Sequence, residues 1–260
     1  MSSKSDSELI PLSRIAGRYV INAKKPFVGE IVLEKNEVRE ILRFAWDMSW
    51  GGAGDHRPNR SGGQQKRDKS IVFQDVFEGK CGEFAVKKKF NSLGIQTSEV
   101  DLRTFERGVW DDTDLLALGK SINVKTAKHF SNLLLLEYED YKCRGDYLGE
   151  TNSNKSYDLF VFTRLKSVLH DFIKDNGLKK KEFSKKEDFF PYAREILQME
   201  WWLDLPGFIT KKRIKEALEL GHIIKQGDLL NYTKMDASNI YVQSGCLISM
   251  GEIMEFLKSA

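Results

Sequence analysis

The segment from Asp112 to Lys128 constrains the fold of this chain most strongly, because it predicts a β-hairpin. A short apolar run at 114–118 is followed by Gly119-Lys120 and by a returning strand at 121–125. Glycine supplies the positive φ that a two-residue hairpin turn requires. We therefore expect Gly119-Lys120 to form the turn, with Leu118 paired to Ser121.

The hairpin would gather three polar side chains on one surface. With Leu118 opposite Ser121, Leu116 faces Asn123 and Asp114 faces Lys125. Side chains alternate between the two faces of a strand, so Asp114, Asn123 and Lys125 project from the same face. Three polar residues at these spacings also occur by chance on an ordinary polar hairpin, and that interpretation stays open on the hairpin alone.

An acid, an amide oxygen and a lysine on one face have a chemical meaning. A carboxylate can hold Mg²⁺, which prefers oxygen ligands and usually keeps several waters. Such an ion polarises a phosphodiester and lowers the pKa of a bound water. A lysine beside that water favours hydroxide and stabilises the charge that develops on phosphorus oxygens. The pattern is thus typical of phosphodiester hydrolysis.

The hairpin resembles the signature of the PD-(D/E)XK nuclease superfamily, whose largest group is the restriction endonucleases. Thr113-Asp114 stands where the family has Pro-Asp, and Asn123-Val124-Lys125 stands where it has an acid, any residue and lysine. The resemblance covers roughly the central hundred residues. It implies a type II site-specific endonuclease that cuts double-stranded DNA with Mg²⁺ as a homodimer, beside a cognate DNA methyltransferase in the same cell.

Asn123 is the serious departure from the family pattern, since a neutral amide oxygen is a weaker Mg²⁺ ligand than a carboxylate. Three explanations stay open: another acid compensates, activity is reduced, or Asn123 is an engineered replacement of a native acid. In the family, a helix before the Asp strand often carries a glutamate that reaches the metal. Glu83 is the match, in the helix expected from Gly82 to Phe90. The resemblance therefore implies Asp114, Asn123 and Glu83 as metal ligands and Lys125 as the catalytic lysine.

A loop rich in glycine, arginine and glutamine at 51–67 is the second informative segment. Arginine is the commonest reader of guanine, and glutamine or asparagine of adenine, in the major groove of DNA. A solvated basic linker would have the same composition. Beside a nuclease site we favour a loop that orders on DNA. The predicted DNA contacts are His56, Arg57, Arg60, Gln64, Gln65, Lys66, Arg67 and, just after the hairpin, Lys128.

Composition limits the class of protein. The chain has 260 residues, 41% hydrophobic, and a net charge of +3, which permits DNA binding if the basic residues cluster. An apolar run of about 18 residues, which a membrane span requires, is missing from the sequence. The three cysteines are widely spaced and the four histidines have no zinc spacing, so we expect free thiols in a reducing cytoplasm.

The order of the patterns predicts an α/β fold with a mixed central sheet flanked by helices, like a restriction-endonuclease core. Helices are expected at 37–48, 82–90, 168–176, 211–220 and 251–257. Buried strands are expected at 133–138 and 157–165, and a strand leading to the site at 95–105. We expect three parts: residues 1–70 as an N-terminal arm with the DNA loop, 71–176 as the catalytic core, and 177–260 as a small C-terminal α/β appendage for DNA grip or dimerisation.

Two alternatives to a restriction enzyme remain at this point. One is a repair or recombination nuclease of the same superfamily, which would cleave by DNA structure. The other is a DNA-binding protein with a nuclease fold that has lost its metal site, an interpretation that Asn123 favours.

Overall fold

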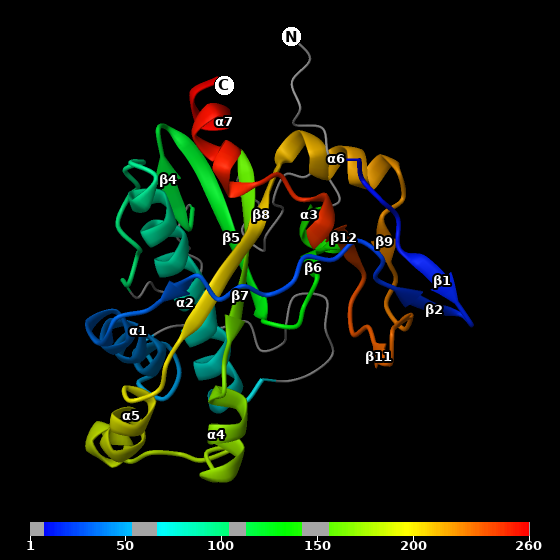
Figure 1. The fold of residues 1–260 in the computed structure, drawn as a ribbon. Coiled ribbons are helices and arrows are strands. Elements are labelled where there is room, and N and C mark those ends of the chain that lie inside the picture. Colours follow the sequence, from blue (N-terminus) through cyan, green and yellow to red (C-terminus); the bar gives the residue numbers. More distant parts are fainter. Residues whose placement is uncertain (1–7, 54–66, 104–112, 142–155, 260) are drawn as a thin grey trace.

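A curled five-stranded mixed sheet lies at the centre of the computed structural model, which describes residues 8–53, 67–103, 113–141 and 156–259. Its strand order is β3-β8-β7-β5-β4. The strands are β3 (Ile31–Val32), β4 (Leu115–Ala117), β5 (Lys120–Lys128), β7 (Leu159–Lys166) and β8 (Trp202–Thr210). β5 and β7 are parallel, and all other neighbours are antiparallel. The expected mixed sheet flanked by helices is therefore present (Figure 1).

The predicted hairpin forms, but its turn lies one residue earlier than expected. Leu118 and Gly119 occupy the turn, with φ of 48° and 78°. Leu116 pairs with Ser121 instead of Asn123, so the pairing is shifted by two residues. Because the shift is even, each side chain keeps the face that was predicted for it. The strand expected at 95–105 is reduced, among its described residues, to a bridge between Thr97 and Ala117.

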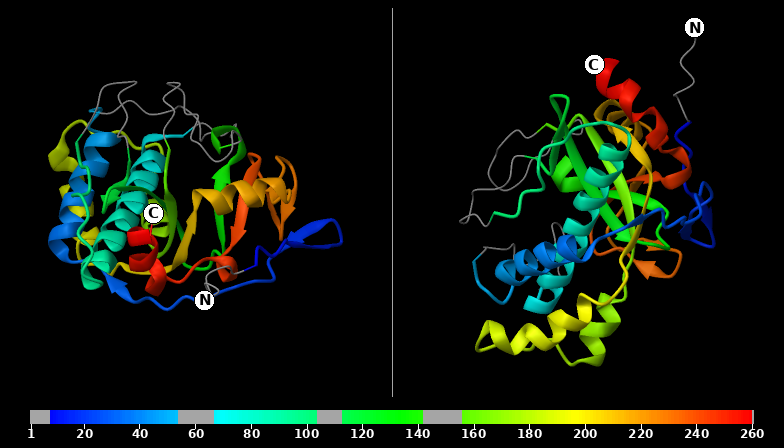
Figure 2. Two further views of the ribbon diagram at one scale, coloured as in Figure 1. Left: turned by 90° about the horizontal axis from the view of Figure 1, so that it is seen from above. Right: turned by 60° about the vertical axis from the view of Figure 1, so that its left-hand side comes forward.

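One long helix covers one face of the main sheet, and a second helix packs on it. The longer, α2 (Lys69–Ser92), crosses β5 and β7, and α1 (Lys35–Met48) packs on α2 (Figure 2). The predicted helix at 37–48 is confirmed. The helix predicted at 82–90 is the second half of α2, which begins far earlier because the Asp68 carboxylate accepts a hydrogen bond from the Ile71 backbone N–H.

An aromatic cluster joins these helices to the next part of the chain. Trp46 and Trp50 of the α1 region contact Phe73, Phe183 and Phe189, with ring centres 4.9–5.5 Å apart. The neighbouring elements are α4 (Leu169–Asp175), a short 3-10 turn (Lys186–Phe189) and α5 (Phe190–Ile196). Trp201 is fully buried, in keeping with a core role for the first residue of the Trp201-Trp202 pair.

A separate three-stranded sheet has the order β6-β12-β9, formed by β6 (Leu133–Glu137), β12 (Asn239–Gln243) and β9 (Ile223–Ile224). The run at 133–138 was expected in the same sheet as the hairpin, and this expectation is wrong. Leu135 of β6 pairs with Tyr241, more than a hundred residues away. α3 (Tyr138–Tyr141) and α6 (Lys211–Glu219) accompany this sheet.

A third sheet projects from the side of the molecule and has the order β1-β2-β10-β11 (Figure 1). Its strands are β1 (Ser13–Ile15), β2 (Arg18–Val20), β10 (Leu229–Leu230) and β11 (Thr233–Lys234). Two short 3-10 turns (Ser244–Cys246 and Met250–Glu252) lead to α7 (Ile253–Ser259) at the end of the chain.

Both ends of the chain contribute to the main sheet. β3 comes from the expected N-terminal arm and β8 from the expected C-terminal appendage. One hydrophobic cluster joins Ile31, Val161, Leu203 and Leu257. The segment after residue 176 therefore builds part of the central sheet as well as the second and third sheets. None of the described helices combines the length and the apolar character needed to cross a membrane.

Candidate functional site

The hairpin fixes Asp114 beside Asn123. Leu115 pairs with Ile122, so the next position in the same register sets Asp114 opposite Asn123. The Asp114 Oδ2 accepts a hydrogen bond of 2.7 Å from the Val124 backbone N–H. The Thr113 hydroxyl donates to the Ile122 carbonyl at 3.1 Å and holds the start of the strand. Backbone contacts on both sides therefore position the carboxylate.

Lys125 lies two residues along β5, on the same face as Asn123. On the neighbouring strand, Phe160 is in register with Asn123, and Phe162 with Lys125. The Lys125 Nζ lies 5.8 Å from the centre of the Tyr141 ring. Within the described part of the chain, Lys125 forms no ion pair. The structure thus brings together three of the four predicted catalytic residues.

Tyr157 is a member of this group that the sequence analysis missed. It is 6% exposed, and Asp114, Lys125 and Asn123 all lie near enough to affect the pKa of its hydroxyl. Burial and the nearby Asp114 charge raise the pKa of Tyr157, against the opposing effects of the Lys125 charge and the Asn123 side chain. The hydroxyl therefore stays protonated at neutral pH. Its only sequence signal was its place just before the buried strand β7.

Asn123 itself is 4% exposed. Its side chain lowers the pKa of the nearby Tyr157 phenol, against the larger opposing effect of burial. The Asn123 Oδ1 is buried and finds no hydrogen-bond partner among the described residues. Such an acceptor is costly to leave unsatisfied, so this oxygen is one to which a ligand could bind.

Glu83 does not join the group. It lies on α2, which packs on the face of β5 that carries Thr126, whereas Asn123 and Lys125 lie on the other face. Glu83 is buried, and its Oε2 accepts from the Lys80 Nζ at 2.8 Å. Because Glu83 and Asn123 lie on opposite faces of β5, Glu83 is not placed to compensate for Asn123. Of the other acids that precede the hairpin, Asp101 pairs with Arg103 at 2.6 Å, and Asp111 and Asp112 lie outside the described residues.

Two of the predicted DNA contacts are described, and both form ion pairs. Arg67 lies 3.5 Å from Asp75, and Lys128 is bonded to Glu78, which also accepts from the Ser167 hydroxyl. The remaining predicted contacts lie outside the described residues; they are His56, Arg57, Arg60, Gln64, Gln65 and Lys66.

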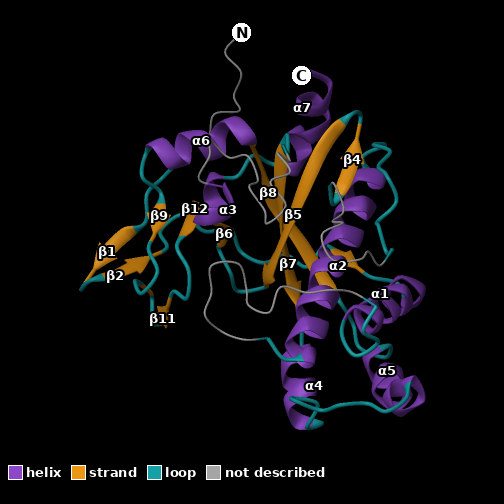
Figure 3. Cartoon of the chain, turned by 180° about the vertical axis from the view of Figure 1, so that it is seen from behind, coloured by secondary structure: helices purple, strands orange, loops and turns teal. Residues whose placement is uncertain are grey.

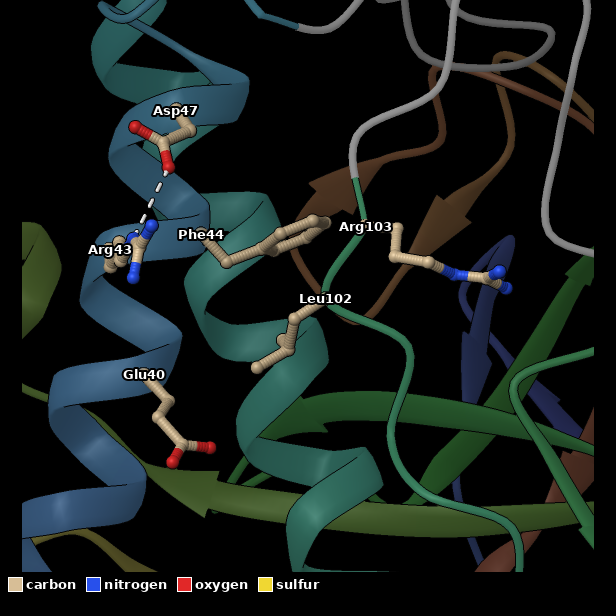
Figure 4. Close-up of a pocket in the computed structure, with 6 residues that line it drawn as sticks. All are labelled: Glu40, Arg43, Phe44, Asp47, Leu102 and Arg103. Atoms are coloured by element: carbon tan, nitrogen blue, oxygen red, sulfur yellow. Dashed lines mark ion pairs between the residues drawn. The ribbon is translucent and has the colours of Figure 1, made fainter.

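A pocket of about 640 Å³ lies between α1 and the segment that contains Leu102 and Arg103 (Figure 4). Its lining is mixed in charge and comprises Glu40, Arg43, Phe44, Asp47, Leu102 and Arg103. Arg43 and Asp47 approach each other at 3.9 Å. None of the predicted catalytic residues lines this pocket, so it is separate from the Asp114 group.

The remaining candidate metal-binding chemistry is sparse. Over the described ranges, no three residues of the types His, Cys, Asp and Glu come close enough to hold a metal ion by themselves. Cys81 and Cys246 are buried, and burial raises the pKa of the Cys81 thiol well above its usual value.

Comparison of the chain with protein-family models, with curated proteins and with solved structures finds no match in any of the three.

Proposed function

We propose that this chain is a Mg²⁺-dependent endonuclease that hydrolyses double-stranded DNA at the Asp114 group. The observation that carries the proposal is the arrangement on the hairpin. It holds a carboxylate, an amide oxygen without a hydrogen-bond partner among the described residues, and a lysine without an ion pair there, on one face of β4–β5. In metal-assisted phosphodiester hydrolysis, oxygen ligands hold the metal ion and a positive group stabilises the charge that develops on the phosphate. These three groups supply both functions.

The ligand atoms that this site offers are of the type that Mg²⁺ prefers. Asp114 and Asn123 offer oxygen atoms, which Mg²⁺ prefers, and the unsatisfied Asn123 Oδ1 supplies a reason for a cation to bind. When bound, Mg²⁺ would supply positive charge to the phosphate and favour ionisation of a water. Only Asp114 contributes a negative charge, so we expect weaker metal binding than two carboxylates would give.

The other residues have separate roles in this proposal. Tyr157, which is buried beside Asn123, restricts the orientations of the Asn123 amide. The Val124 backbone N–H fixes one oxygen of Asp114 at 2.7 Å. Lys125 would orient the attacking water and stabilise the negative charge that develops on the phosphate.

The choice of substrate rests on the sequence. The arginine- and glutamine-rich segment at 51–67 suits contacts to base edges and phosphates. A type II restriction enzyme would use it to recognise a palindromic site as a symmetric homodimer, because two-fold DNA matches two-fold protein. Such an enzyme would act in the cytoplasm beside a methyltransferase that protects the host DNA. A repair or recombination nuclease would use the same hairpin on DNA of a particular structure.

A second candidate function is DNA binding without cleavage. Asn123 favours it, because a neutral residue stands at the position of the second acid and Glu83 lies on the other face of the sheet. Calorimetry of Mg²⁺ binding in the presence of DNA separates the two functions. Detectable binding is expected for the nuclease, and its absence would favour the binding protein.

The role of Lys125 is tested by Lys125→Ala. We expect cleavage of DNA to fall about 100- to 1,000-fold, since one charged group that stabilises the transition state is lost. DNA affinity should change little. Lys120→Ala is the matched control, because Lys120 lies on β5 but alternates to the opposite face. Cleavage by Lys125→Ala at a rate close to that of the parent would contradict this site.

A further inference from the structure

The third sheet presents one solvent-facing surface, the outer face, which has no part in the proposed site. Residues directly opposite each other in a strand pair share a face. Ile15 pairs with Arg18, and Leu229 with Lys234. Leu230 is in register with Tyr19, so Leu229 lies beside Arg18 on the same face. The outer face therefore carries Ile15, Arg18, Leu229 and Lys234.

The opposite face of this sheet is turned toward the protein. Tyr19 and Leu230 pack against a buried cluster that includes Leu12, Ile224 and Tyr241. In contrast, Ile15 and Leu229 of the outer face are exposed, at 60% and 37%, and Arg18 is partly buried. The views in Figures 1 and 3 agree that the hairpin β1–β2 stands out at one edge of the molecule.

Tyr232 makes this face unusual. It lies in the turn between β10 and β11 and is 87% exposed. The Arg18 guanidinium carbon lies 4.7 Å from the centre of its ring. An arginine over one side of an aromatic ring is a cation–π pair. This contact holds the tyrosine ring beside the outer face while most of the ring remains open to solvent.

The charge of the outer face has one sign. Its strand residues are Ser13, Ile15, Arg18, Val20, Leu229 and Lys234, and all of them are described. Among these six, two are cations and none is an acid. Arg14 lies on the inner face, where it stacks on Tyr19 and approaches Asp228 at 3.9 Å. The outer face therefore suits a partner that offers both negative charge and flat apolar rings.

We propose that the outer face binds single-stranded nucleic acid. A base would stack on Tyr232, and the neighbouring phosphates would contact Arg18 and Lys234. Base stacking on an aromatic side chain requires an unpaired base, which distinguishes a single strand from a duplex. A lipid surface is the less favoured partner, because among the side chains of this face only Ile15 is both aliphatic and more than half exposed. The proposal does not depend on the nuclease site.

The test is binding of the full chain to a fluorescent oligothymidine of about 15 nucleotides, measured by anisotropy in EDTA so that no cleavage occurs. We expect Tyr232→Ala to weaken binding about tenfold, whereas Tyr232→Phe, which keeps the ring, should bind like the parent. Because Tyr232 is largely exposed, the melting temperatures should agree and show that each variant folds.

The electrostatic contribution to binding is tested with a matched pair of arginine variants. Arg18→Ala should weaken binding and reduce the slope of log affinity against log salt by about one. Arg39→Ala removes an exposed arginine of α1 and should leave both the affinity and the salt slope unchanged. Equal affinity of the parent and Tyr232→Ala would overturn the proposal. A second result would also overturn it: the parent binds anionic phosphatidylserine vesicles but not the oligonucleotide, and Tyr232→Ala no longer binds the vesicles.

Discussion

Asn123 is the residue on which the proposed chemistry depends most. Its amide is almost fully buried beside Tyr157, and its carbonyl oxygen lacks a hydrogen-bond partner among the described residues. An unsatisfied buried acceptor costs about 1–3 kcal/mol. A cation held between Asn123 and Asp114 would remove this cost, which links the stability of the hairpin to metal binding.

A second residue gives the molecule a defined response to pH. His222 is 3% exposed and its ring stacks on Tyr241 with centres 4.9 Å apart. Burial lowers the pKa of His222 from its usual value of about 6.5, and the Glu216 charge opposes this only in part. The unfolded chain therefore takes up this proton at a higher pH than the folded protein does. His222 lowers the free energy of unfolding as pH falls below about 6.5.

His222→Phe keeps the stacked ring and removes the titration. We expect the parent to lose more stability than the variant between about pH 7.5 and pH 5, measured by urea denaturation at each pH. An equal loss in both proteins would show that the buried imidazole does not titrate in this way.

For single residues, the sequence predicted which side chains of the hairpin share a face, because side chains alternate between the two faces of a strand. It did not predict the turn. Leu118 adopts φ of 48°, which non-glycine residues rarely do, so Gly119-Lys120 was the natural choice. The partnership of Tyr157 with Asn123 was also hidden, since it depends on the parallel pairing of β5 with β7.

At the scale of elements, the contact of α2 with the main sheet positions the hairpin. Gly82 lies where the helix comes closest to the strands. A Cβ at this position would stand 1.9 Å from the Thr126 Oγ1 and 2.7 Å from the Thr163 Oγ1. The two threonines are hydrogen-bonded to each other at 2.9 Å across β5 and β7. Glycine is therefore required by space in the middle of α2.

Gly82→Ala should lower the free energy of unfolding by about 1–3 kcal/mol, because the added methyl forces the helix away from the sheet. Gly79→Ala is the matched control in the same helix, since a Cβ there meets no atom within 4 Å. It should be neutral or stabilising by up to about 1 kcal/mol. Equal effects of the two substitutions in urea denaturation would contradict the close approach.

The sequence predicted the amphipathic helices better than the pairing of the strands. The run at 133–138 is apolar whichever sheet it joins, so its partner β12 could not be found from local pattern. β8 was missed because Pro206 and Gly207 interrupt it, and proline usually excludes a central strand. The pairing of β7 with β8 shifts between Phe162 and Arg164, and this irregularity accommodates the proline.

At the scale of the whole molecule, one buried ion pair ties distant segments together. Arg164 of β7 and Asp204 of β8 are 1% and 3% exposed, and the Arg164 Nε donates to the Asp204 Oδ1 at 2.9 Å. The guanidinium also donates to the carbonyls of Lys25 and Pro26, both at 2.8 Å. The chain that leads from the third sheet to β3 is thereby fixed across the main sheet.

Asp204→Asn should cost about 3–5 kcal/mol of stability, because it leaves a buried guanidinium without its counter-charge. Glu182→Gln makes the same chemical change in an exposed pair with Lys69 and should cost less than about 1 kcal/mol. Both are measured by urea denaturation. A similar small loss in the two variants would mean that Arg164 does not hold the segments as described.

The most direct test of the central claim is digestion of a large viral DNA with Mg²⁺ by this chain beside its Asn123→Asp variant. We predict discrete fragments with the variant, because the substitution restores a second carboxylate beside Asp114, and slower production of the same fragments with the parent. Intact DNA with both proteins would contradict the endonuclease, and a smear would contradict cleavage at specific sequences.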